Sequence, residues 1–180
     1  MKLYAFLADG FETVEALAVI DILRRGQVQV VIVSVMGRPQ VVSAQNIPVI
    51  ADCLFEDCDF EDGDGIFLPG GGDGTKNLEA HKGLSAVIDN YYSKNKIVAA
   101  ICAAPSILGH HNILNGRKAT CYPGFEKELY GAEFSEDGVV TDGNVTTGKG
   151  MGKSVDMGLR LLSIMKGQEV SDDIKSKIMY

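Results

Sequence analysis

Cys102 follows an apolar run and precedes small residues and a proline, in the sequence AAICAAP of residues 99–105. A buried strand that turns sharply into a helix exposes the residue at the turn, and hydrolases present a nucleophile in this way. Pro105 suits the first turn of such a helix, and the free amides at that helix end favour a thiolate. The pattern predicts a nucleophilic thiol. The alternative is a buried cysteine that packs as a small hydrophobic side chain.

Two glutamates are the candidate partners of this thiol. Glu12 and Glu15 are three residues apart, so they lie near one another on a helix surface. Glu15 precedes a mostly apolar stretch and is expected to face the sheet, where desolvation raises the pKa of a carboxyl group. A protonated Glu15 could donate a hydrogen bond to a thiolate and then transfer protons to and from a substrate. The alternative is that both glutamates are solvated charges at a helix N-terminus.

The three histidines do not supply a base. His110 is eight residues after Cys102, which corresponds to about 12 Å along a helix. His81 lies in a polar turn, and no histidine follows His111. A cysteine–histidine triad with a late histidine therefore cannot be built from this sequence.

Glycine-rich residues 148–154, GKGMGKS, are close to a phosphate-binding loop but do not match it. The pattern requires a glycine at position 147, where the chain has Thr147. The dinucleotide pattern fails as well, because Lys153 stands where its last glycine belongs. Nucleotide binding is therefore disfavoured. The remaining interpretations are a simple glycine turn, or a small-anion site of backbone amides near Lys149.

Length and charge bound the class of protein. A chain of 180 residues suits one domain, here residues 1–180, and a net charge of −7 argues against nucleic-acid or anionic-membrane partners. No apolar run is long enough to cross a bilayer, and the first residues read as a strand, without a signal-peptide cleavage site. The four cysteines show no Cys-x-x-Cys spacing. We therefore expect reduced thiols and a cytoplasmic location.

Apolar runs alternate with amphipathic stretches along the chain. Strands are predicted at 3–8, 28–35, 65–68, 96–101, 119–122 and within 139–147, with a hairpin over 41–50. Helices are predicted at 13–25, 84–92, 104–110 and 151–165, with a short helix at the end of the chain. This alternation predicts an α/β, flavodoxin-like three-layer sandwich with a mainly parallel central sheet. The segments after Asp9, Pro69 and Cys102 should then meet at the carboxyl ends of the strands.

Several of these segments together resemble the ThiJ/PfpI superfamily, in the branch of the Parkinson-associated protein DJ-1 and its bacterial relatives. They are ETVE at 12–15, Asp21, RRG at 24–26, LPGG at 68–71 and AAICAAP at 99–105. The resemblance covers essentially the whole chain. It implies a homodimer with a flavodoxin-like fold. It also implies a reactive Cys102, a protonated Glu15 touching it, and an oxyanion or substrate pocket that involves Gly70, Gly71, Ala103 and Tyr122.

The resemblance implies a cofactor-free glyoxalase or deglycase, a chaperone or a sensor of oxidative stress. Three departures bear on how substrates are held. Tyr122 replaces a histidine found in some members, the loop 148–152 reads GKGMG where close relatives have SRGPG, and Gln45 replaces an arginine near the partner's pocket. Cys121, close to the pocket strand, is either a resolving thiol for Cys102 or a buried cysteine.

Three hypotheses follow. In the first, the Cys102 thiolate adds to the carbonyl of a small α-oxoaldehyde, and Glu15 moves protons, with no metal or organic cofactor. In the second, the protein is an oxidative-stress sensor or holdase in which Cys102 is oxidised to the sulfinic state. The third and weakest is a small-anion binding module that uses Lys149 and its glycine turn.

Overall fold

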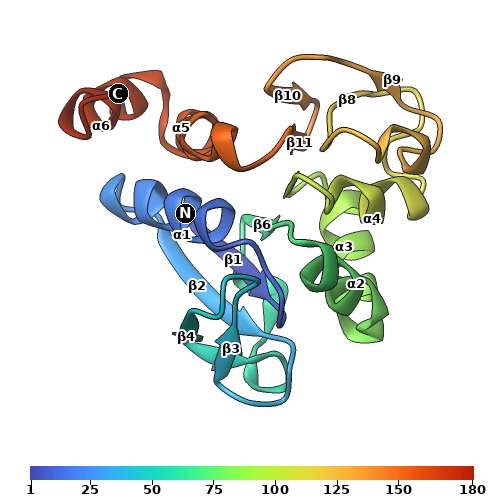
Figure 1. Cartoon of the computed structure of the whole chain (residues 1–180). Coiled ribbons are helices and arrows are strands. Elements are labelled where there is room, and N and C mark those ends of the chain that lie inside the picture. Colours follow the sequence, from blue (N-terminus) through green and yellow to red (C-terminus); the bar gives the residue numbers. More distant parts are fainter.

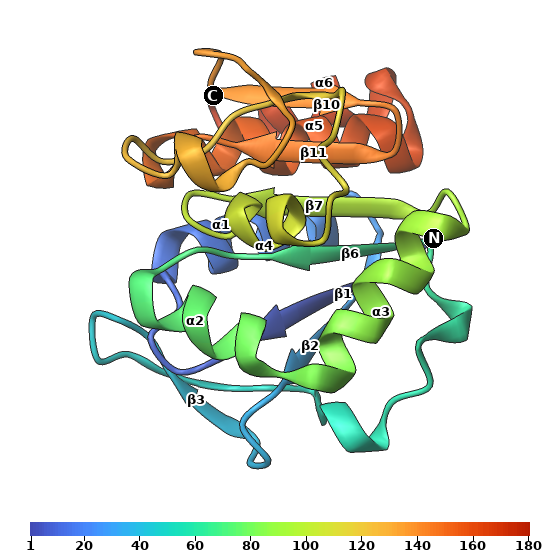
Figure 2. The same ribbon diagram turned by 90° about the vertical axis from the view of Figure 1, so that its right-hand side faces the viewer.

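The computed structural model describes residues 1–180 and has one large sheet between two layers of helices (Figure 1). Figure 2 shows the order of the strands across the sheet, with β10 and β11 at one side and β2 toward the other. All neighbours in this sheet are parallel except β10 and β11. In spatial order the strands are β10 (Val139–Asp142), β11 (Val145–Gly148), β7 (Ile97–Ile101), β6 (Gly65–Leu68), β1 (Lys2–Leu7), β2 (Gln29–Ser34) and β5 (Cys53–Leu54).

The helices cover the two faces of the sheet and enclose two apolar clusters. One cluster lies under α1, α5 and α6, and the other under α2, α3 and α4. No helix is long and apolar enough to span a membrane. The helices are α1 (Thr13–Arg25), α2 (Gly72–Ala80), α3 (Lys82–Ser93), α4 (Pro105–His110), α5 (Ser154–Lys166) and α6 (Gln168–Lys177), with 3-10 turns η1 (Phe55–Asp57), η2 (Phe60–Asp62), η3 (Glu126–Glu128) and η4 (Met151–Lys153).

The predicted fold class is confirmed. Helix α1 has the predicted bounds, and strands β1, β2, β6 and β7 lie within a residue of theirs. The hairpin is formed by β3 (Gln40–Val42) and β4 (Pro48–Ile50), and a further short pair joins β8 (Lys118–Ala119) to β9 (Glu133–Phe134). Helix α2 was not predicted, because two glycines in its first turn give it a low helix propensity.

Helix α1 is fixed at both ends by its own sequence. The Glu12 side chain accepts a hydrogen bond from the Glu15 amide, which caps the N-terminus, and Gly26 ends the helix. Gly26 also allows close packing, since a methyl group there would lie 2.2 Å from a methyl carbon of Leu162 on α5. The face carrying Glu15 is therefore held against the sheet.

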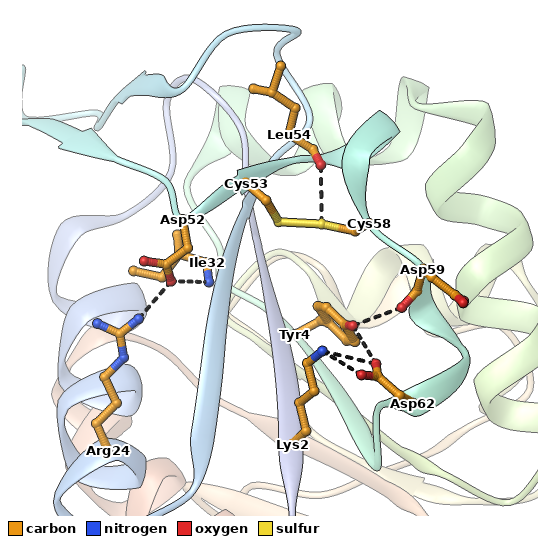
Figure 3. The surroundings of a disulfide bond; sticks show 10 residues. All are labelled: Lys2, Tyr4, Arg24, Ile32, Asp52, Cys53, Leu54, Cys58, Asp59 and Asp62. Atoms are coloured by element: carbon orange, nitrogen blue, oxygen red, sulfur yellow. Dashed lines mark hydrogen bonds and ion pairs between the residues drawn. A yellow bond between two sulfur atoms is a disulfide. The ribbon is translucent and has the colours of Figure 1, made fainter.

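The prediction of four reduced thiols is wrong for Cys53 and Cys58. The structure joins them in a disulfide, while Cys102 and Cys121 are free (Figure 3). The 3-10 turn η1 lies between them and folds the chain back so that the two sulfurs meet. A five-residue separation matches no standard redox motif, so the spacing alone did not indicate the pair.

His110 at the end of α4 links three segments through two carboxylates. Its Nδ1 contacts Glu79 of α2, and its Nε2 lies 2.9 Å from Glu128 of η3. The Tyr130 ring is 5.0 Å away, centroid to centroid. Burial opposes a charge on the ring, but hydrogen bonds to both carboxylates outweigh it and raise the pKa of His110.

The raised pKa of His110 predicts a pH-dependent stability. The pKa of His110 is higher in the folded protein than in the unfolded chain, where it is near 6.5. Protonation of His110 therefore stabilises the fold below pH 6.5, and this stabilisation is lost as the pH rises through the folded-state pKa. The free energy of unfolding of the wild type should exceed that of His110→Gln at pH 6, and the gap should close by pH 8.5. We expect the difference in the free energy of unfolding to be at most about 1 kcal/mol, because the side chains of His110, Glu79 and Glu128 are partly exposed. Urea unfolding at both pH values measures it, and a gap that stays constant would contradict the linkage.

Candidate active site

Three strand ends meet at one edge of the sheet, as predicted. The backbone amide of Glu12, after β1, donates to the carbonyl of Gly70, after β6, at 2.9 Å. The amide of Gly74 in α2 donates to the carbonyl of Gly10 at 3.1 Å. Cys102 follows the neighbouring strand β7. This convergence places the cysteine, the glycine run and the start of α1 around one site.

Cys102 occupies a sharp strand-to-helix turn with a φ of +67°, in the left-handed region that non-glycine residues rarely adopt. Two backbone hydrogen bonds of 2.8 Å hold this conformation. The Cys102 amide donates to the Gly148 carbonyl, and the Cys102 carbonyl accepts from the Tyr122 amide. The side chain is half-buried, so the thiol can be reached from outside. The structure therefore favours the nucleophile over the buried filler.

Glu15 is buried, with only 1% of its surface exposed. Its Oε2 accepts a hydrogen bond from the Gly70 amide at 3.0 Å, and its carboxyl group also hydrogen-bonds Cys102. Burial raises the pKa of Glu15 to about 7, assisted by the charge of Glu12, while the bonds from Cys102 and Gly70 act in the opposite direction. The predicted inward-facing acid with a raised pKa is therefore present.

The thiol of Cys102 differs from the prediction in one respect. Burial raises the pKa of Cys102 to about 12, and the charge of Glu15 and the hydrogen bond to it add to the rise. The backbone amides of Gly71 and Ala103 contact the sulfur and lower the pKa, but they do not outweigh burial. The helix-end amides therefore favour the thiolate, as predicted, but burial has the larger effect on the pKa of Cys102.

Cys102 and Glu15 are therefore best described as one pair that shares a proton. A charged Glu15 beside a thiolate would place two negative charges in a partly desolvated site, and the raised pKa of Cys102 reflects the cost of that state. When the carboxyl group takes the proton, the repulsion disappears and its O–H can donate to the sulfur. A thiolate in this site thus requires a protonated Glu15.

Gly70 and Gly71 let the backbone pass close to both groups. A methyl group on Gly70 would lie 2.6 Å from Cys102 Cβ and 2.6 Å from Glu15 Oε2. Gly71 has a φ of +96°, and a methyl group there would lie 2.2 Å from the Gly10 carbonyl oxygen. Both positions therefore require glycine, Gly70 for space and Gly71 also for its conformation.

Gly70→Ala should disable the site without unfolding the protein. The added methyl group forces Cys102 and Glu15 apart, and a misplacement of about 1 Å can reduce catalysis about 100-fold. Gly72→Ala is the matched control, because no atom lies within 4 Å of its added methyl group. Alkylation of Cys102 and turnover of an α-oxoaldehyde measure the effect. Equal rates in the two variants would contradict the packing argument.

Tyr122 and Lys149 line a shallow hollow of about 330 Å³. Tyr122 contacts Cys102 through its backbone, and its ring is half exposed and lies against Gly150. Lys149 contacts Glu136 through its ammonium group at 2.6 Å. The hollow is lined by Tyr122, Pro123, Lys149, Gly150, Met151, Gly152 and Lys153.

Two other residues from the sequence analysis lie away from the thiol. Gln45 accepts hydrogen bonds from the amide and hydroxyl of Thr13 in its own chain, at the start of α1. Cys121 is fully buried in the cluster under α2, α3 and α4, whereas Cys102 packs against the cluster on the other face of the sheet. This favours the buried filler over the resolving thiol for Cys121.

Gly148 is a contributor that the sequence did not reveal. Its carbonyl fixes the Cys102 amide because β11 and β7 pair in a register that sets Gly148 opposite Ile101. Only strand pairing specifies this contact, and no motif indicates it. No group of three or more histidine, cysteine or acidic side chains is arranged to hold a metal ion.

Comparisons with known proteins identify the family of this chain. The sequence profile of the DJ-1/PfpI family matches residues 1–164. Protein DJ-1 homolog A of Arabidopsis thaliana is 35% identical over 96% of the chain, and protein DJ-1alpha of Drosophila melanogaster is 32% identical over 97% of the chain and 82% of its own length. The chain spans less than half of the Arabidopsis homologs A and B, 45% and 37% of their lengths.

Solved structures show the same fold. Oxidized DJ-1 of Toxoplasma gondii has a TM-score of 0.96 at 29% identity, covering 99% of this chain and 98% of that one. A DJ-1 superfamily protein from Salmonella typhimurium, solved as a mutant, has a TM-score of 0.95 at 31% identity, with the same coverage.

Proposed function

The chain belongs to the DJ-1/PfpI family, and from that premise we propose that it is a cofactor-free enzyme that converts α-oxoaldehydes into 2-hydroxy acids. The family includes deglycase, glyoxalase-like and oxidative-stress roles. The glyoxalase-like reaction, methylglyoxal to lactate, suits a site with one nucleophile and one buried acid. The observation that carries the proposal is the hydrogen-bonded contact between Cys102 and a Glu15 whose pKa is about 7.

In the proposed reaction, the sulfur of Cys102 adds to the aldehyde carbon while the protonated Glu15 gives its proton to the carbonyl oxygen, which forms a hemithioacetal and leaves Glu15 as a carboxylate. The amides of Gly71 and Ala103, which contact the sulfur, donate to the oxygen on which charge develops. Glu15 removes the hydrogen of the former aldehyde carbon as a proton and returns it to the neighbouring carbon, which leaves a thioester. Water then adds to the thioester, the carbon–sulfur bond breaks, and the 2-hydroxy acid leaves. The net change is addition of one water molecule, with no external oxidant.

A pKa near 7 suits Glu15 to this work. A group that must both accept and donate a proton is most effective when its pKa is close to the working pH. Burial gives Glu15 this property, and the Gly70 amide fixes the direction in which its carboxyl group points. The proposal therefore assigns Glu15 as the general acid and base.

The test is lactate formation from methylglyoxal by dialysed wild-type protein, followed by proton NMR without glutathione and with a metal chelator present. Lactate formation that scales with protein concentration supports the proposal. Absence of lactate, in a preparation whose Cys102 is fully reduced and alkylatable, would overturn it.

A second candidate is a redox sensor or holdase, and two observations favour it. Cys102 is reachable from outside, and its sulfur contacts two backbone amides that can donate hydrogen bonds to added oxygens. A similar solved structure, DJ-1 of Toxoplasma gondii, is described as oxidized. A gain of two oxygen atoms on Cys102 at low peroxide, together with negligible lactate formation, would favour this function over the enzyme.

We also propose that the protein is a homodimer. Val14 on α1 and Ile47 and Ile50 around β4 expose 44%, 46% and 64% of their surfaces. They belong to adjacent segments, since the hairpin contacts the start of α1 through Gln45 and Thr13. Sedimentation should show a dimer that Ile50→Asp weakens. A monomer at micromolar concentration would contradict this.

A further inference from the structure

Cys53 and Cys58 form a second sulfur centre, separate from Cys102. Cys53 lies in β5 at the edge of the sheet, and Cys58 follows η1. Four strand spacings separate β5 from β7, the strand before Cys102, which is about 19 Å. Both Cys53 and Cys58 are half-buried, so small thiols and peroxides can reach them. The pair does not depend on the function proposed for Cys102.

The structure offers a hydrogen-bond partner to the reduced form of this pair. In the structure the two sulfurs are joined, and Cys58 Sγ also lies 3.2 Å from the Leu54 carbonyl oxygen (Figure 3). A disulfide sulfur has no hydrogen to donate, whereas a Cys58 thiol has one. The reduced form therefore already has a hydrogen-bond acceptor in place. This acceptor favours a reduced Cys58 that stays close to its position in the disulfide.

The loop between the two cysteines is anchored by Phe55. Its ring lies 4.8 Å from that of Phe60 and 4.4 Å from that of His81, centroid to centroid. A methyl group on Gly83, near the start of α3, would come within 2.6 Å of the Phe55 ring. The disulfide thus closes a loop that is already packed against α3. This packing keeps the two thiols together after reduction.

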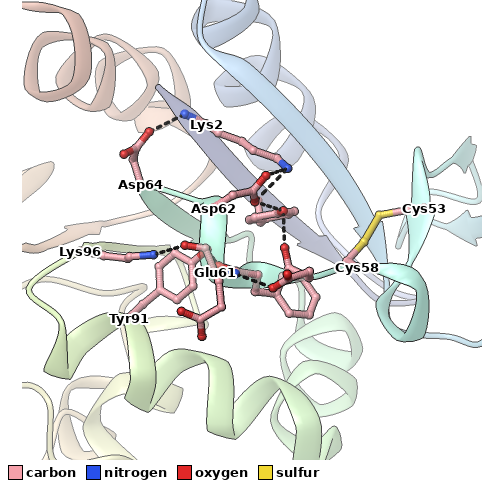
Figure 4. A network of polar contacts seen from close by, with 11 residues as sticks. Lys2, Cys53, Cys58, Glu61, Asp62, Asp64, Tyr91 and Lys96 are labelled. Atoms are coloured by element: carbon pink, nitrogen blue, oxygen red, sulfur yellow. Dashed lines mark hydrogen bonds and ion pairs between the residues drawn. A yellow bond between two sulfur atoms is a disulfide. The ribbon is translucent and has the colours of Figure 1, made fainter.

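The surroundings of the pair are strongly acidic. Of the seven carboxylates in residues 52–64, those of Asp52 and Asp62 pair with Arg24 and Lys2 (Figures 3 and 4). The carboxylate of Glu61 pairs with Lys94. Glu56 and Asp57, which lie between the two cysteines, are exposed and have no ion pair. Their charges repel an approaching anion and attract a cation over several ångströms.

We propose that Cys53 and Cys58 form a reversible redox site whose acidic loop selects the thiol that reduces it, favouring cationic over anionic thiols. With hydrogen peroxide as oxidant, one thiol becomes a sulfenic acid and releases water. The second thiol then attacks that sulfur, the disulfide forms, and a second water leaves. In the reverse direction two molecules of an external thiol supply the electrons and are themselves joined in a disulfide. Glu56 and Asp57 are the selectivity residues.

Formation of the disulfide can be followed on separate tryptic peptides. Cys53 and Cys58 are the only cysteines of Gly26–Lys76, and Cys102 is the only one of Ile97–Arg117. Fully reduced protein exposed to peroxide should lose two hydrogens on the first peptide and become resistant to alkylation there. Cys102→Ser should behave in the same way. Two alkylatable thiols after peroxide would overturn the proposal.

Selectivity is tested with cysteamine, a cationic thiol, and 2-mercaptoethanesulfonate, an anionic one. The ratio of their reduction rates is compared between the wild type and Glu56→Gln/Asp57→Asn, so that the intrinsic reactivities of the two thiols cancel. At low ionic strength the ratio should fall about tenfold in the variant, and the wild-type ratio should shrink in high salt. Glu169→Gln/Asp172→Asn, on distant α6, removes two exposed acidic charges as well and is the matched surface-charge control. An unchanged ratio in the double variant would overturn the selectivity.

Discussion

Cys102→Ser is expected to reduce the conversion of methylglyoxal to lactate at least about 1,000-fold, because a serine hydroxyl lacks the acidity and nucleophilicity of a thiol in the same site. The fold should not change, since the backbone hydrogen bonds of Cys102 to Gly148 and Tyr122 do not involve its side chain. Lactate formation followed by NMR measures the loss.

Cys121→Ala is the matched control for this substitution. Cys121 is the other free cysteine, and it is buried in the cluster on the opposite face of the sheet. Its removal should leave turnover within about twofold, although some stability is lost with the buried side chain. If the serine variant at position 102 kept more than a tenth of the activity, the assigned nucleophile would be wrong.

Glu15→Gln is expected to be less active but, at higher pH, more stable relative to the wild type. The folded-state pKa of Glu15 is raised to about 7 from a model-peptide value near 4.5, chiefly by burial. A raised pKa means that the stabilising protonated form is fully present below pH 4.5 and is lost as pH rises toward 7. Glutamine does not ionise, so the Glu15→Gln variant does not lose stability in this way as the pH rises.

The difference in the free energy of unfolding between Glu15→Gln and the wild type should therefore shift in favour of the variant by up to about 3 kcal/mol between pH 4.5 and pH 8. Urea unfolding in a Cys102→Ser background isolates the carboxyl group, because no thiol then titrates beside it. Turnover in the Cys102 protein should fall about 100-fold or more with glutamine. A difference that does not vary with pH would show that Glu15 is not buried as described.

Much of the fold and of the candidate site follows from local patterns in the sequence. The apolar run before Cys102 and the small residues after it predict the turn that the structure contains. The inward direction of Glu15 follows from the apolar residues after it on α1. These features depend on neighbours in the chain, so periodicity and spacing could indicate them.

Features that depend on distant segments could not be predicted in this way. The pKa of Cys102 reflects burial by several segments, whereas the sequence reveals only the helix that follows it. The positions of Cys121 and Gly148 depend on strand pairing. The Cys53–Cys58 pair depends on how η1 folds the chain.

The central claim is that Cys102 becomes a thiolate by passing its proton to Glu15, so the most direct measurement is the rate of Cys102 alkylation as a function of pH in the wild type and in Glu15→Gln. We predict an inflection near pH 7 for the wild type, where the first proton leaves the pair, and an inflection at least about one pH unit higher for the variant, which cannot accept the proton. Identical profiles, or a wild-type thiol that reacts only near pH 12, would contradict the account.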